Sequence, residues 1–200
     1  MENLVTDVKK CFDKVPEFDK LNSKQILWNS TGNGLRQHAP SHENDIKRIL
    51  DYINVLVSEG KIHKDNFSVL DMCCGDVVVL NRIKNTYPES KLYGFDILST
   101  YFNVTNIPNV SLYSNSNRNT SNDILIHNCS IQDFLKQNLT LDTKIDVVVT
   151  KNTLDSFCSQ KAPNSQKVIN KHLMDRWRLW IKTNANYHIT SHPKWNLIKT

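Results

Sequence analysis

The segment "SVLDMCCGDVVVL", from Ser68 to Leu80, restricts the fold more than any other part of the sequence. A short apolar run leads into a cysteine pair and a glycine, and apolar residues at helical spacing follow. This pattern predicts a buried strand over residues 67–72, a turn, and a helix over residues 77–87. The segment "KLYGFDIL" predicts a second buried strand over residues 91–98. A strand, a helix and a strand in this order form a βαβ unit with both strands in a parallel sheet.

The same alternation continues toward the end of the chain. Strands are expected at residues 123–128, 144–152 and 185–192, and helices at residues 131–137 and 165–182. The segment between residues 109 and 123 is polar and rich in turn-forming residues, and it is expected to contain an exposed loop at residues 114–122. The expected fold is therefore α/β: a Rossmann-like, doubly wound, mostly parallel sheet of at least five strands.

A helix is also expected ahead of the first strand. Pro40 is expected to end any regular element before it, Ser41 to cap the helix, and Gly60 to stop it. Its apolar stripe consists of Ile46, Ile49, Leu50, Ile53, Val55 and Leu56. We divide the chain into an N-terminal helical and loop extension, residues 1–44, and an α/β domain, residues 45–200.

Composition narrows the functional classes. No apolar run approaches the roughly 20 residues that span a membrane, and the N-terminus lacks the apolar core of a secretory signal, so we expect a cytoplasmic protein. The net charge of +5 is scattered over the sequence, which favours a mixed solvated surface over a nucleic-acid partner. Five cysteines, an odd number without zinc spacing, argue against both a disulfide framework and a metal site.

Two acidic residues are placed where a ligand would bind. In open α/β sheets, ligands bind beyond the carboxyl ends of the strands, which is where the turn after Asp71 lies. Asp96 ends the second strand, 21 positions after Gly75. An acid about 20 residues past a glycine turn hydrogen-bonds ribose hydroxyls in nucleotide-binding folds. The alternative for Asp96 is a carboxylate that caps a nearby helix.

This arrangement resembles the class I S-adenosylmethionine-dependent methyltransferases, whose first motif reads roughly V-L-D-x-G-C-G-x-G. "VLDMCCGDV" is similar to it, "YGFDI" resembles the second motif, and "IQDFL" and "IDVVVTKNTLDSF" resemble the third and fourth more weakly. The resemblance covers residues 45–192 and implies S-adenosylmethionine as cofactor. Ser130 is an alternative to Asp133 in the third motif. The cofactor-binding residues that it implies are Asp71, Cys73, Gly75, Asp76, Asp96, Ile97 and Asp133.

The chain also departs from the family pattern. Cys73 and Val77 stand where the first and last glycines are expected, and the β-branch of Val77 is expected to crowd the methionine end of the cofactor. A non-catalytic binding module with this fold is therefore an alternative. The family normally has seven strands, so the sheet is either trimmed at its C-terminal side or completed differently.

The charge of the residues in the turn distinguishes the methyltransferase hypothesis from the alternative of a nucleotide-binding, oxidoreductase-like domain. A dinucleotide fold needs a G-x-G-x-x-G turn that leaves its backbone bare against a pyrophosphate. Only one of those glycines is present, and Asp76 would lie beside a phosphate. S-adenosylmethionine carries a sulfonium and an ammonium group, which carboxylates at Asp71 and Asp76 suit.

Residues for the methyl acceptor are harder to assign. Arg36 and His38 lie in a glycine-containing loop ahead of the first helix, and Asn152 and Asp155 follow the fourth strand. "TKNTLDSF" faintly resembles a segment of lysine methyltransferases that act on elongation factors. These four residues are our candidates for binding an N or O acceptor whose identity stays open. Trp177, on the last helix, is expected to pack in the core together with Trp180.

Overall fold

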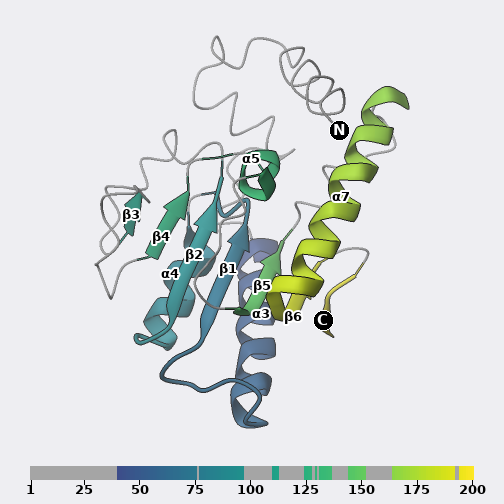
Figure 1. Cartoon of the computed structure of the whole chain (residues 1–200). Helices are drawn as coiled ribbons and strands as arrows, with labels where there is room; N and C mark the ends of the chain where they lie inside the picture. Colours follow the sequence, from purple (N-terminus) through teal and green to yellow (C-terminus); the bar gives the residue numbers. More distant parts are fainter. Residues whose placement is uncertain are drawn as a thin grey trace.

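The described part of the chain forms a single sheet flanked by helices (Figure 1). The structure is a computed structural model, and it describes residues 40–75, 77–96, 110–112, 124–127, 129, 131–136, 144–151, 164–191 and 194–200. The strands are β1 (Ser68–Met72), β2 (Lys91–Phe95), β3 (Val110–Leu112), β4 (Ile124–His127), β5 (Ile145–Thr150), β6 (Ala185–Thr190) and β7 (Asn196–Lys199). The helices are α3 (Pro40–Ser58), α4 (Val78–Thr86), α5 (Ile131–Lys136) and α7 (Asn164–Asn184).

The seven strands follow the order β3-β4-β2-β1-β5-β6-β7. All neighbouring pairs are parallel except β6 and β7, which are antiparallel. The parallel strands point toward the upper edge of Figure 1, so their carboxyl ends and α5 lie at that edge. The predicted fold class, a doubly wound and mostly parallel sheet, is confirmed.

Two strands were not predicted. β3 has three residues and lies in the polar, turn-rich segment just ahead of the expected loop, where so short a strand leaves no readable alternation. β7 is an edge strand with mostly exposed side chains, so its sequence lacks the apolar run of a buried strand. Of the two alternatives for the C-terminal side, the trimmed sheet is excluded, since β7 adds an antiparallel strand beyond β6 and the sheet has seven strands.

The helices cover both faces of the sheet. α3 and α4 pack on one face against Val69 of β1, and α5 and α7 pack on the other against Leu70 and Met72 (Figure 1). Successive residues of a strand point to opposite faces, so β1, which is buried along its whole length, contributes side chains to both core layers. None of the described helices is long and apolar enough to cross a membrane.

The start of α3 differs from the sequence prediction, whereas its end agrees with it. Pro40 begins the helix, because a proline in the first turn has no N–H to leave unsatisfied. Ser41 therefore lies inside the helix and is not its cap. At the other end, Gly60 has a φ of 67°, and Lys61 N donates to Leu56 O at 2.9 Å, which is a Schellman termination as predicted.

One member of the expected apolar stripe is also misplaced. Val55 is 43% exposed, whereas Ile53 and Leu56 are fully buried. It lies two positions after Ile53, on the opposite side of a helix with 3.6 residues per turn. α3 also continues across the boundary set between residues 44 and 45, and residues 1–39 of the predicted extension lie outside the described residues.

A polar network aligns the amino ends of three strands. Asp146 Oδ2 accepts hydrogen bonds from Ser68 N at 2.8 Å and from Ser68 Oγ at 3.0 Å, and Asp146 N donates back to Ser68 Oγ. Asn186 Nδ2 donates to Asp146 Oδ1 at 3.2 Å. These bonds join the first residue of β1 to the second residues of β5 and β6, at the edge opposite the carboxyl ends, and so fix the register of the strands.

Gly94 provides the first test of the packing. A Cβ at this position would lie 2.7 Å from Cys74 Sγ, 3.0 Å from Cys74 Cβ and 2.9 Å from Ile126 Cδ1. We expect Gly94→Ala to lower the free energy of unfolding by about 1–3 kcal/mol because it overpacks the core. The cost should be smaller in a Cys74→Ala background, where the sulfur is gone. Urea unfolding of the four proteins measures both costs, and equal costs in the two backgrounds would contradict the role of the Cys74 contact.

Candidate functional site at the carboxyl ends of the strands

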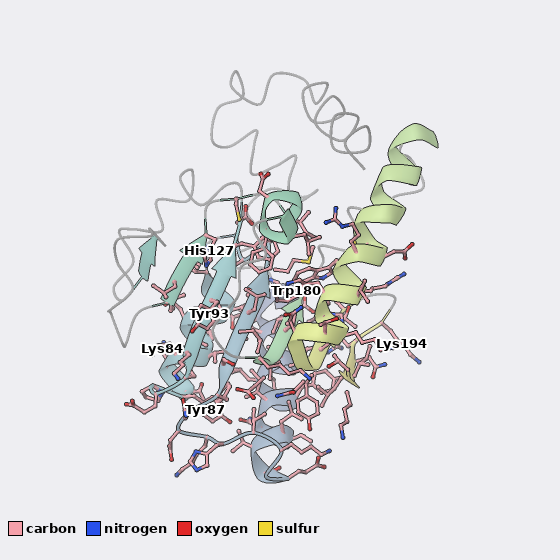
Figure 2. All side chains as sticks on the ribbon, viewed as in Figure 1. Lys84, Tyr87, Tyr93, His127, Trp180 and Lys194 are labelled. Carbon is pink, nitrogen blue, oxygen red and sulfur yellow. The ribbon has the colours of Figure 1, made fainter. Side chains whose placement is uncertain are left out.

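Three neighbouring strands bring the candidate residues together. The parallel register aligns Met72 with Phe95 and Phe95 with His127, the last residues of β1, β2 and β4. Cys73 and Asp96 therefore follow directly after two adjacent strands, and Figure 2 shows His127 at the upper end of the third. The sequence pattern predicted each strand end separately. Because β1, β2 and β4 are neighbours in the sheet, their carboxyl ends lie side by side and form one site.

The turn between β1 and α4 has an unusual backbone. Cys73, Gly75 and Val77 have φ angles of 54°, 54° and 59°, all in the left-handed region. These are the three positions at which the first motif of class I methyltransferases has glycine. A left-handed conformation costs a residue with a side chain roughly 1–2 kcal/mol. The turn therefore keeps the glycine conformation at two positions where the sequence supplies other residues.

Hydrogen bonds tie this turn to the next two strands. Cys74 N donates to Phe95 O at 3.2 Å, and Gly75 N donates to Asp96 Oδ2 at 3.0 Å. Asp96 N in turn donates to His127 O at 3.1 Å. The Asp96 carboxylate thus holds the turn in place. Gly75 lies before α4 begins at Val78, so Asp96 caps the turn and not the helix.

The side chain of Val77 lies on the other side of the turn from where it was expected. It is fully buried and packs in the core layer of α3 and α4. The expectation that its β-branch crowds the cofactor space is wrong, because the left-handed backbone turns the side chain into the core. Cys73 is half-buried and packs against the opposite layer, that of α5 and α7.

Carboxylates give the site a negative potential. Asp71 and Asp96 are 3% and 7% exposed. Burial, then Asp71 and Asp96, raises the pKa of the buried Cys74 thiol well above its usual value. Burial, then Asp133 and Asp96, raises the pKa of Cys129 to about 11. Asp133 of α5 and Asp96 after β2 therefore both act on this one thiol. This set of groups fits a ligand with cationic groups and hydroxyls, and it disfavours a phosphate.

The remaining predicted site residues cannot be compared with the geometry. Arg36, His38, Asp76, Ile97, Asn152 and Asp155, together with the alternative Ser130, lie outside the described residues. Their roles stay predictions. Within the described ranges, no group of three or more His, Cys, Asp or Glu side chains is arranged to hold a metal ion.

Two buried histidines near the strand ends were missed by sequence reasoning. His127 is 6% exposed, and burial lowers its pKa to about 4. His188 of β6 shares a hydrogen bond of 2.8 Å with Thr150 Oγ1, at the end of β5. Burial, with a smaller effect of Arg178, lowers the pKa of His188 to about 4. Each histidine lies within a strand that the sequence predicts to be buried. A polar residue at such a position was the feature from which a buried histidine could have been predicted.

Comparison with known structures agrees with this geometry. The bifunctional kinase-methyltransferase WbdD matches over 94% of this chain and 34% of its own, with a TM-score of 0.50 and 15% sequence identity. The fold is that of the class I methyltransferases. At this identity the likeness is one of fold alone. No protein-family model and no curated protein matches the sequence.

Two further structural neighbours are methyltransferases that align less closely. The plantazolicin methyltransferase BpumL, in complex with a monoazolic desmethylPZN analogue and S-adenosylhomocysteine (SAH), has a TM-score of 0.47, 13% identity and coverage of 84% of this chain. Magnesium protoporphyrin IX methyltransferase from Synechocystis PCC 6803, with bound S-adenosylmethionine, has a TM-score of 0.45, 16% identity and 85% coverage. The chain spans 58% of the BpumL chain and 76% of the Synechocystis chain.

The left-handed turn of this methyltransferase-like fold predicts a stability difference at Cys73. Cys73→Gly should be more stable than Cys73→Ala by about 1 kcal/mol, since glycine adopts a positive φ without steric cost and the gain exceeds its loss of chain entropy. Both variants lack the thiol, so the comparison isolates the backbone. Chemical unfolding measures the difference, and a more stable alanine variant would contradict a left-handed conformation at this position.

The low pKa of His188 predicts loss of stability in acid. Its pKa is about 4 in the folded chain and about 6.5 when unfolded, so the unfolded state binds the proton more tightly between these values. The stabilisation is complete above pH 6.5 and is lost as the pH falls toward 4, by roughly 2–3 kcal/mol for this residue.

Two variants separate this titration from loss of the hydrogen bond. His188→Gln should weaken the pH dependence of the unfolding free energy and leave the part that the buried His127 contributes, whereas Thr150→Val should lower stability and keep the full dependence. An unchanged pH profile in His188→Gln would show that His188 is not the group that titrates.

Proposed function

We propose that the chain is an S-adenosylmethionine-dependent methyltransferase that transfers a methyl group to an N or O acceptor, on a small molecule or a protein side chain. The observation that carries the proposal is the turn from Cys73 to Val77. It has a left-handed backbone at all three glycine positions of the methyltransferase motif, and the acid that ends β2 holds it through Gly75. The fold it shares with WbdD supports the same class.

The described residues suit the parts of this cofactor. Asp96 lies beside the turn, where a carboxylate can accept hydrogen bonds from ribose hydroxyls. Asp71 acts on the Cys74 thiol and Asp133 on the Cys129 thiol, and Asp96 acts on both, so the site carries negative charge. Such charge favours a sulfonium and an ammonium group over a pyrophosphate. Bound S-adenosylmethionine would supply an activated methyl group, and the chain would contribute proximity and orientation.

The geometry of the site bears on the two alternative functions, an oxidoreductase-like domain and a non-catalytic binding module. A nucleotide-binding, oxidoreductase-like domain would have to accept phosphates beside carboxylates, which the electrostatics disfavour. The case for a non-catalytic binding module depended on Val77 crowding the cofactor. Because that side chain packs in the core, the argument from Val77 no longer favours the module.

Ligand binding to the purified chain tests the proposal. SAH should raise the melting temperature and titrate calorimetrically, because a ligand that binds only the folded state stabilises it. NAD and ATP should not. A higher melting temperature with NAD or ATP but not with SAH would favour the oxidoreductase-like alternative. Binding of SAH without methyl transfer to any N or O acceptor offered would favour the binding module.

Asp96→Asn tests the ribose assignment. A hydrogen bond to a charged acceptor is worth roughly 1.5–3 kcal/mol, so we expect affinity for SAH to fall about tenfold to a hundredfold. Asparagine is preferable to alanine, because its amide oxygen can still accept the Gly75 N–H. Asp146→Asn, in the network at the opposite edge of the sheet, is the control: it should lower stability and leave affinity unchanged. Wild-type affinity in Asp96→Asn would exclude the assignment.

A further inference from the structure

Four aromatic rings join α5 to α7 and to the end of β2. The ring of Phe134 stacks on Phe95 with centroids 4.3 Å apart and planes at 19°. It makes edge contacts with Trp177 at 6.1 Å and Trp180 at 5.2 Å, and the two indoles stack on each other at 5.1 Å. We call Phe95, Phe134, Trp177 and Trp180 the aromatic cluster. The expectation that the two tryptophans pack in the core is confirmed for Trp177, which is fully buried, and Figure 2 shows Trp180 on α7.

α5 depends on this cluster for its position. A helix of six residues is too short to be stable alone, so tertiary packing decides where it lies. Phe134 is fully buried and is the largest side chain through which α5 contacts the sheet. Among the described residues, the buried Trp177 Nε1 has no hydrogen-bond partner. Packing between rings, and not polar contact, therefore determines the arrangement of Trp177 against Phe134.

Asp133 directly precedes Phe134 on the same short helix. Asp96 directly follows Phe95, so the stacking of Phe134 on Phe95 brings the two acids to the same end of the sheet. Both carboxylates also raise the pKa of the Cys129 thiol. Asp96 is held by its place at the end of β2 and by its hydrogen bond from Gly75 N, whereas the position of Asp133 depends on where α5 lies. Any shift of the Phe134 ring would change the distance between Asp133 and the other acid.

We propose that Phe134 is a positioning residue for Asp133: the aromatic cluster holds α5 so that Asp133 faces the same space as Asp96. The consequence for cofactor affinity rests on the proposed function. The arrangement of the two acids beside Cys129 does not, and it can be measured without a cofactor.

Cys129 serves as a probe of the local potential. Its half-buried thiolate reacts with iodoacetamide, which is neutral, and with iodoacetate, which is an anion of similar size. The ratio of the two alkylation rates cancels the thiolate fraction and the access to the sulfur, and leaves the repulsion of the anion by Asp96 and Asp133. Mass spectrometry of the peptide that contains Cys129 gives both rates.

We expect Asp133→Asn to raise the iodoacetate to iodoacetamide ratio roughly threefold to tenfold, because one negative charge near the sulfur is removed. Phe134→Leu should raise it in the same direction, since α5 is no longer held. The double variant should show no further rise, because Phe134 acts through Asp133. Ile181→Ala, a buried residue of the same core layer outside the cluster, should lower stability and leave the ratio unchanged.

Two results would contradict a positioning role of Phe134. A wild-type ratio in folded Phe134→Leu, or effects of the two changes that multiply in the double variant, would overturn the proposal. If Phe134→Leu does not fold, Trp180→Leu removes a half-buried ring of the same cluster and should give the same rise; a wild-type ratio there would equally overturn it.

A second experiment measures the affinity of the same variants for SAH by calorimetry. Phe134→Leu should weaken binding in the wild-type background and have little further effect in Asp133→Asn. If the wild-type chain itself does not bind SAH, the proposed function fails. The alkylation ratios still decide whether Phe134 positions Asp133.

Discussion

The hydrogen bond from Gly75 N to the Asp96 carboxylate joins two segments that the sequence separates by a whole helix. The backbone bond from Cys74 to Phe95 lies beside it, and Gly94 leaves room for the Cys74 side chain to pack against β2. The turn after β1 and the end of β2 therefore behave as one unit. The start of α4, and the direction in which that helix leaves the sheet, follow from this junction.

A second consequence of the parallel sheet is electrostatic. Parallel strands end at the same edge, so acids that end or follow different strands accumulate there without being neighbours in the sequence. The raised pKa values of Cys74 and Cys129 record this accumulation, since both thiols are kept protonated by burial and by nearby carboxylates. Such a site attracts cations, and its cysteines are poor nucleophiles at neutral pH.

Sequence periodicity was sufficient for the parts of the fold that are buried on both faces. β1 and β5 are mostly apolar and buried, and the rule that ligands bind at strand ends predicted Asp71 and Asp96 as site residues. Periodicity failed where the signal is short or exposed, as in β3 and β7, and at the start of α3, where Ser41 was expected as the cap and Pro40 begins the helix. The contacts of Phe134 with Phe95 and of His188 with Thr150 join distant residues, and local patterns contain no information on them.

Val77 and Cys73 show how a chain can do without two glycines. Their side chains enter opposite core layers, so each strained backbone angle is held by hydrophobic packing from its own side of the sheet. A glycine pattern describes one solution to a requirement on φ angles, and packing on both sides is another. Chains of this second kind would share the shape of the turn with their relatives while losing the residues by which sequence comparison recognises it.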